Sequence, residues 1–212
     1  MNVNDDYDDE YQPYLSLKQI NDIKSNLGKL PVFTKSHQRP PMPLKHFQLY
    51  IDFLYYCAMR PSEPLKIRFE DIDLENREVK IHKPKTAKMY WQKASIPAPM
   101  VEKIKTHLLN GNNYASTDEF LFKGTRVTLW KYLKAAGVLA GINEVETFDK
   151  REIVGVFPYM FRHAYVQRME DLGAKKSLRQ LKLRHKFSDS EGHYSKPRIG
   201  ILKSWENKYI AE

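Results

Sequence analysis

Apolar residues recur at helical spacing along much of the chain. Residues 44–59 show this most clearly, with Phe47, Tyr50, Ile51 and Leu54 three or four positions apart. Residues 16–27 are expected to form a second helix, because Ser16 and Gln19 can build a capping box at its start. Further helices are predicted over residues 101–110, 128–141, 175–185 and 200–212, and in the segment that follows Pro158.

Two other stretches alternate between apolar and polar residues, which is the pattern of a half-buried strand. They are residues 77–83 and 92–99, and the basic segment between them, residues 84–91, predicts a hairpin tip. Residues 33–43 contain three prolines within four positions and are expected to be a loop, as are residues 142–157. The predicted fold class is mainly α with a small antiparallel β-sheet.

The charge distribution divides the chain into an acidic start and a basic remainder. The first ten residues, MNVNDDYDDE, hold five acidic residues and no basic one. Residues 1–13 are therefore expected to be a disordered tail before a single compact domain over residues 14–212. The 202 residues after the first ten contain all 35 Lys and Arg residues against 21 Asp and Glu, an excess of 14 positive charges. This excess favours a polyanionic partner such as nucleic acid, and an ordinary basic surface is the alternative interpretation.

Composition and motifs exclude several kinds of site. The single cysteine, Cys57, cannot form a disulfide within the chain and fits a reducing compartment. No run approaches the roughly 18 apolar residues of a membrane span, and the acidic start lacks a signal region, so a cytoplasmic protein is expected. The sequence has no HExxH, cysteine cluster, EF-hand loop, Walker loop or GxGxxG. It therefore signals neither a metal nor a nucleotide site, and no cofactor is expected.

The stretch YMFRHAYVQRM, residues 159–169, carries polar groups where a helix in a core usually carries apolar ones. Tyr159, Arg162 and His163 fall at i, i+3 and i+4, so they share one helix face. Other candidates lie beside structural breaks: Arg60 in AMRPSEPL, Lys85 and Lys88 in KPKTAKM, His185 in LKLRH, and Tyr194 in EGHYSKP. Taken singly, each has an ordinary explanation as a helix cap, a solubilising turn residue or a packing residue.

Taken in order, these residues resemble the signature of the tyrosine recombinases, also called phage integrases: Arg…Lys…His-x-x-Arg…His…Tyr. The matching positions are Arg60 and Glu63 in the family's GxRxSE segment, Arg162 with His163 directly after it, and His185 in its LGH motif. His185 lies 23 residues beyond Arg162, a usual family spacing, and Tyr194 falls where the family keeps its nucleophile. The resemblance extends from about Tyr14 to Tyr194 and implies the family's catalytic-domain fold.

The resemblance also implies a function and a role for each residue. The chain would cleave and rejoin double-stranded DNA in site-specific recombination, for integration or excision of a mobile element. The implied catalytic residues are Arg60, Arg162, Tyr159 and His185 around the scissile phosphate, Tyr194 as the nucleophile and Lys85 as the general acid, with Glu63 and His163 in support. Self-association on DNA as a dimer or tetramer synapse and a nucleoid location are implied as well. A 3′-phosphotyrosine retains the bond energy, so neither ATP nor a metal is required.

Three features depart from the family pattern. Tyr159 stands where most members have His, although a phenol can also donate a hydrogen bond to a phosphate oxygen. Arg184 replaces the Gly of the LGH motif, which puts the local backbone conformation in question. The hairpin is long, so Lys88 is an alternative general acid: the KT pair favours Lys85, and the distance to Pro97 favours Lys88.

Other interpretations stay open at the level of sequence. A type IB topoisomerase would share the chemistry without exchanging DNA partners. A non-catalytic DNA-binding remnant is a second alternative, and the presence of every catalytic position argues against it. A basic helical interaction module unrelated to DNA is the third. Family members usually carry an N-terminal DNA-clamping domain, and we expect none here. The chain would then be either an excised catalytic fragment or a naturally short protein.

Overall fold

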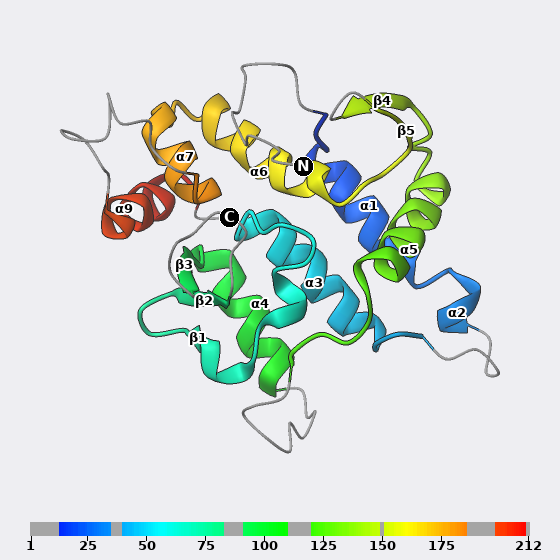
Figure 1. The fold of residues 1–212 in the computed structure, drawn as a ribbon, viewed down its shortest axis with the longest axis horizontal. Coiled ribbons are helices and arrows are strands. Elements are labelled where there is room, and N and C mark those ends of the chain that lie inside the picture. Colours follow the sequence, from blue (N-terminus) through cyan, green and yellow to red (C-terminus); the bar gives the residue numbers. More distant parts are fainter. Residues whose placement is uncertain are drawn as a thin grey trace.

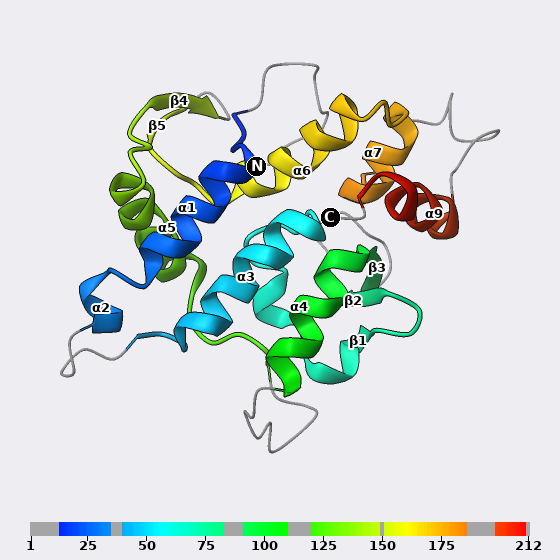
Figure 2. The same cartoon turned by 180° about the vertical axis from the view of Figure 1, so that it is seen from behind.

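The structure, a computed structural model, describes residues 13–34, 40–82, 91–109, 120–148, 151–185 and 198–210. Helices dominate it, as the sequence predicts, and a small antiparallel sheet lies beside them (Figures 1 and 2). The helices are α1 Leu17–Leu27, α2 Pro31–Thr34, α3 Leu44–Tyr56, α4 Ala98–Leu109, α5 Arg126–Leu139, α6 Tyr159–Asp171, α7 Lys176–Leu183 and α9 Ile199–Tyr209, with 3-10 turns η1 Pro64–Lys66 and η2 Phe69–Asp71. Within these ranges, no helix is long and apolar enough to cross a membrane.

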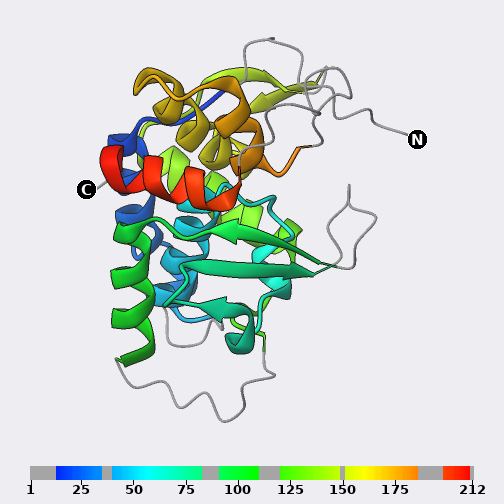
Figure 3. The same ribbon diagram turned by 90° about the vertical axis from the view of Figure 1, so that its left-hand side faces the viewer.

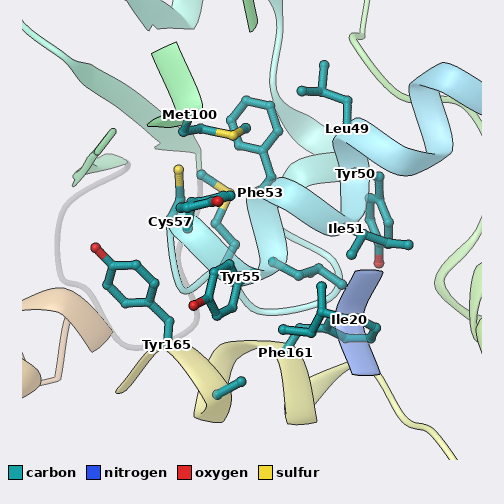
Figure 4. Packing of buried hydrophobic residues seen from close by; sticks show 14 of the residues in the cluster. Ile20, Leu49, Tyr50, Ile51, Phe53, Tyr55, Cys57, Met100, Phe161 and Tyr165 are labelled. Carbon is teal, nitrogen blue, oxygen red and sulfur yellow. The ribbon is translucent and has the colours of Figure 1, made fainter. Parts of the chain in front are cut away.

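Helix α3 is the centre of the core because it is apolar on nearly every side. Nine of its 13 residues are buried, and it packs against α1, α4 and α6. Figure 4 shows its side chains in one cluster with Ile20 of α1, Met100 of α4 and Phe161 of α6. The chain therefore leaves α3 deep inside the protein, and Arg60 follows at that point.

The sheet has three antiparallel strands in the order β1 Ile72–Asp73, β2 Glu78–His82 and β3 Trp91–Ser95. Val79 lies opposite Ala94, and both are buried on the core face, as the alternating pattern of the two strands predicts. Helix α9 packs against β3 and lies along this edge of the sheet (Figure 3). The predicted hairpin of β2 and β3 is thus confirmed, and β1 extends it.

Residues 142–157 do not form the loop that we expected. They contain a second antiparallel hairpin, β4 Val145–Phe148 and β5 Arg151–Val154, which pairs Val145 with Val154. Val145 is 59% exposed and Val154 is 48% exposed, so this pair does not lie against the core. Val145 and Val154 thus lack the buried environment that makes apolar and polar positions alternate visibly along a strand.

Several predicted boundaries shift by a few residues. The capping box of α1 is confirmed, with Ser16 and Gln19 bonded reciprocally. Helix α4 begins three residues before the predicted start, at Ala98, because the Pro97 carbonyl accepts the first amide bonds of the helix. Residues 1–12 of the expected tail lie outside the described residues, whereas Pro13 is buried.

A buried ion pair fixes helix α9 to the rest of the protein. The Lys182 ammonium at the end of α7 donates to the Glu206 carboxylate of α9 at 2.6 Å, and both side chains are 1% exposed. The same carboxylate oxygen accepts from Tyr165 at 2.8 Å and Ser95 at 3.2 Å, so α6, α7, α9 and β3 meet at one atom. Such a pair costs free energy to desolvate, and its geometry selects one docked position of α9.

We expect Glu206→Gln to lower the free energy of unfolding by about 3–5 kcal/mol, because it leaves the Lys182 charge buried without a counter-charge. The double variant Lys182→Met/Glu206→Gln removes both charges and should be more stable than the single variant. Urea unfolding followed by circular dichroism measures both. The matched control is Asp22→Asn, which breaks the exposed Lys18–Asp22 pair and should cost under about 1 kcal/mol. Equal losses in Glu206→Gln and the control would contradict a dry ion pair.

Candidate active site

Arg60 and Glu63 lie just beyond the end of α3, and Arg60 donates two hydrogen bonds to the Glu63 carboxylate. The backbone amide of Arg60 donates to Glu63 Oε2 at 2.8 Å, and its Nη1 donates to Oε1 at 3.2 Å. Arg60 is 8% exposed and Glu63 is 6% exposed. The preceding Ala58 has φ +46°, a left-handed conformation that is costly for a residue with a Cβ. Strained residues of this kind are frequent at functional sites.

Arg162 reaches this point from the first turn of α6. Its guanidinium donates from Nη1 to the Ala58 carbonyl and from Nη2 to the Leu183 carbonyl at 2.7 Å. Nη2 is also 3.3 Å from His185 Nε2. Arg162 is only 2% exposed, so α6 places a charged group where the ends of α3 and α7 meet. The predicted convergence of Arg60, Arg162 and His185 is present in the structure.

Arg184 also belongs to this cluster, which the sequence did not indicate. It is the C-cap of α7 and has φ +57° and ψ +37°, the left-handed conformation that a glycine adopts readily at this position. The replacement of glycine by Arg184 therefore does not change the backbone at this position, because Arg184 itself adopts the left-handed conformation. Its Nη2 donates to Glu63 Oε2 at 2.6 Å and to the Ala58 carbonyl at 3.2 Å, and Nη1 donates to the Cys57 carbonyl at 3.1 Å.

Three guanidinium groups therefore surround one carboxylate. Burial alone would raise the pKa of Glu63, but the charges of Arg184, Arg162 and Arg60 and the Arg60 amide hold that pKa below its usual value. Glu63 is consequently ionised, and the three arginines and Glu63 together carry a net charge of +2. A buried excess of positive charge is suited to an anion with several oxygen atoms, because guanidinium forks match phosphate geometry.

His185 is a neutral imidazole at the edge of this cluster. Burial, and then the charges of Arg162, Arg60 and Arg184, lower its pKa to about 3. A guanidinium can only donate, so Nε2 of His185 accepts from Arg162 and the ring proton lies on Nδ1. His185 therefore adds no charge to the cluster at neutral pH.

Tyr159 and His163 lie together on the first turns of α6, with their ring centroids 6.2 Å apart. Nδ1 of His163 donates to the Pro13 carbonyl at 3.2 Å, so this side chain ties the start of the described chain to α6. Burial and the Arg162 charge lower the pKa of His163 to about 4. The supporting role of His163 and the role of Tyr159 at a phosphate both stay predictions.

A pocket of about 350 Å³ opens beside the cluster. Strand β3 forms one wall with Gln92, Lys93, Ala94 and Ser95, and the other walls are Leu181, Lys182, Arg184, His185, Ile199 and Leu202. Three of the predicted residues, Lys85, Lys88 and Tyr194, lie outside the described residues. The described residues that flank them in sequence do reach the site region, since β3 follows the hairpin segment and both His185 and Ile199 line the pocket.

The phage integrase family model matches residues 18–197 of the chain. Similar solved structures include the XerA recombinase, with a TM-score of 0.56 and 14% identity over 95% of this chain. The XerH site-specific recombinase bound to difH substrate gives a TM-score of 0.59 and 19% identity over 96% of this chain. The lambda integrase catalytic core gives 0.53 and 15% over 84%.

These similar structures differ in how much of them the chain covers. It spans 65% of the XerA chain and 54% of the XerH chain, but 94% of the lambda catalytic core. At these identities, the likeness shows the fold. A search of curated proteins found no match.

We expect acid to destabilise the protein partly through His163. The folded form takes up this proton only near pH 4, whereas an unfolded chain takes it up near pH 6.5. The contribution is therefore complete above pH 6.5 and is lost as the pH falls toward 4. His163→Asn keeps a donor for the Pro13 carbonyl and does not titrate.

Between pH 6.5 and 4.5, the free energy of unfolding should fall by about 2 kcal/mol less in His163→Asn than in the wild type. Urea titrations at each pH measure this difference in slope, which is independent of the variant's absolute stability. His107 and His185, whose pKa values are also lowered, should leave a residual slope in both proteins. Parallel pH profiles would show that His163 titrates normally in the folded state.

Proposed function

Since the chain belongs to the phage integrase family, we propose that it cleaves and rejoins DNA strands through a covalent 3′-phosphotyrosine intermediate. The observation that carries the proposal is one buried cluster with a net positive charge, in which Arg60 and Arg184 bind Glu63 and Arg162 contacts His185. A scissile phosphodiester is an anion that fits this charge. On this proposal, residues 14–212 form the catalytic domain.

The arginines would act on the charge that builds up in the transition state. Attack on phosphorus places additional negative charge on the non-bridging oxygens, and preorganised donors stabilise it more strongly than water does. Arg162 is already oriented by the Ala58 and Leu183 carbonyls, and Arg60 by Glu63. Neither side chain then has to reorganise during the reaction. His185 and Tyr159 would donate further hydrogen bonds to the same phosphate.

Tyr194 would be the nucleophile. Its Oη forms a bond to phosphorus while the bond from phosphorus to the 5′-oxygen breaks, which gives a 3′-phosphotyrosine and a free 5′-hydroxyl. The phenol loses a proton and the 5′-oxygen gains one, so the step is balanced. An isolated phenol has a pKa of about 10, and the positive site would favour its ionisation. Rejoining is the reverse reaction with the 5′-hydroxyl of another strand, so the energy of the bond is retained.

Lys85 would donate the proton to the 5′-oxygen, with Lys88 as the alternative. The hairpin segment that carries both connects β2 to β3, and β3 lines the same pocket as Arg184 and His185. This connection in the sequence supports a general acid from that segment. General acid catalysis is needed because an alkoxide is a poor leaving group at neutral pH.

The partner would be double-stranded DNA, with self-association on DNA into a dimer or tetramer synapse. Two supports are the 14-charge excess of the chain after its acidic start and the similar structures, in which XerH is bound to difH substrate and the Tn1549 transposon integrase is in complex with transposon right end DNA. Backbone contacts by the remaining Lys and Arg would give salt-dependent affinity. Integration or excision of a mobile element is the biological role that we propose.

Tyr194→Phe should abolish covalent DNA adducts while folding and DNA affinity stay within about twofold of the wild type, because only the attacking oxygen is lost. The measurement uses nicked suicide duplexes from the DNA that flanks the gene, with adducts resolved on denaturing gels. Tyr209→Phe in α9 is the matched control and should retain the adduct. An adduct that persists in Tyr194→Phe would move the assignment to Tyr159 or Tyr209. Plasmid relaxation without recombinant products would favour topoisomerase activity instead.

Lys85→Ala should lose at least about a hundredfold in cleavage rate on normal DNA, since the 5′-oxygen then leaves unprotonated. A substrate with a bridging 5′-sulfur has a better leaving group and should restore cleavage by this variant. It should not restore cleavage by Arg162→Ala, which lacks phosphate stabilisation rather than a proton. Lys88→Ala is assayed on both substrates. If sulfur rescues Lys88→Ala and Lys85→Ala cleaves normally, Lys88 is the acid, and if neither is impaired, Lys93 or His185 is the next candidate.

A further inference from the structure

We propose that Arg184 is a positioning residue of this site, which holds the Glu63 carboxylate beside Arg60 and supplies the positive charge that Glu63 would otherwise cancel. This inference rests on the proposed function, because it assigns Arg184 to the binding of the same phosphate. It concerns a residue that the sequence pattern marks only as a departure.

An arginine at this position is costly for the fold. The C-cap of α7 needs a left-handed residue, and glycine meets that need without strain. Arg184 adds a second cost, because its Nε is buried and has no hydrogen-bond partner among the described residues. Neither the strained backbone nor the unpaired Nε is needed to end α7, because glycine ends a helix without them. The Arg184 side chain therefore has a further role.

The contacts of the guanidinium supply that reason. Its four Nη hydrogens are directed at Glu63, at the carbonyls of Cys57 and Ala58, and at the Lys182 carbonyl. Glu63 is the residue that orients Arg60, and the Ala58 carbonyl is the acceptor that orients Arg162. Arg184 therefore contacts a group that positions each of the other two arginines.

The charge balance leads to the same conclusion. Without Arg184, the carboxylate of Glu63 would cancel one of the two remaining arginines, and the buried cluster would carry one positive charge. With Arg184 it carries two. The transition state of phosphoryl transfer concentrates more negative charge on the phosphate oxygens than the bound diester does, so the second charge should act mainly on the rate and little on DNA affinity.

The test compares Arg184→Gln, Arg184→Gly and Arg184→Lys with the matched control Arg179→Gln. Arg179 lies on the same helix and pairs with Glu170 of α6. The single-turnover rate of adduct formation should fall about tenfold to a hundredfold in the Gln and Gly variants, with DNA affinity within about threefold of the wild type. The Lys variant keeps the charge and should recover part of the rate. The control should cleave normally.

Two additional measurements separate positioning from stability. Arg184→Gly relieves the left-handed strain while it removes the same charge as Arg184→Gln, so the two variants should differ in thermal stability yet share the slow rate. In nuclear magnetic resonance titrations, the pKa of His185 should rise in both variants and stay unchanged in Arg179→Gln. In a Glu63→Gln background, Arg184→Gln should cost less than it does in the wild type, because its partner is already neutral.

The possible outcomes distinguish the role of Arg184 from the proposed function itself. Wild-type rates in the folded Gln and Gly variants would overturn the role of Arg184 and leave the proposed function in place, as would fully additive losses with Glu63→Gln. A rate that follows stability alone, slow in Gln and normal in Gly, would also overturn it. Absence of any adduct from the wild-type protein would overturn the proposed function and, with it, this inference.

Discussion

Three arginine side chains and one glutamate share a space that is almost closed to water, and the local structure follows from keeping those charges buried. Removing an ion from water costs several kcal/mol even after relaxation, so each guanidinium needs acceptors that cannot move away. Backbone carbonyls meet that need at the ends of α3 and α7, where helices leave their last carbonyls without internal partners. Arg162 and Arg184 use the carbonyls of Cys57, Ala58, Lys182 and Leu183.

This use of helix ends explains two unusual backbone conformations. Ala58 and Arg184 both have positive φ without being glycine, and both lie where a helix has just ended. The left-handed conformation turns the chain sharply and directs carbonyls into the cluster. In return, the Ala58 carbonyl accepts two charged donors, and charge-assisted hydrogen bonds are stronger than neutral ones. Strain and charge burial are thus coupled, and the net positive charge that remains is available to an anion.

The surrounding fold holds this site from several sides. Helix α3 carries Arg60 out of the hydrophobic core, α6 brings Arg162 across it, and α7 ends in Arg184 and His185. The Lys182–Glu206 pair then docks α9 against α7 and β3, and Lys182 lies two residues before Arg184 in the sequence. The segment that contains Tyr194 joins His185 to α9, so on the proposed function the docking of α9 sets where that segment ends. Catalysis and the docking of the last helix would therefore depend on the same short stretch of α7.

Local sequence patterns determined the helical class, the β2–β3 hairpin and the start of α1. The helices and the hairpin have a buried face that repeats at a fixed spacing, and α1 has a capping pair three residues apart. The resemblance to the tyrosine recombinase signature, in residue order and spacing, singled out Arg60, Glu63, Arg162, His163 and His185, which the fold places in or beside one site. The hairpin β4–β5 was missed, and its paired valines, Val145 and Val154, are exposed rather than packed on the core. The role of Arg184 depended on tertiary structure alone. Its left-handed backbone and its contact with Glu63, 121 positions away in sequence, arise from where two helices end in space, and no local pattern records that distance.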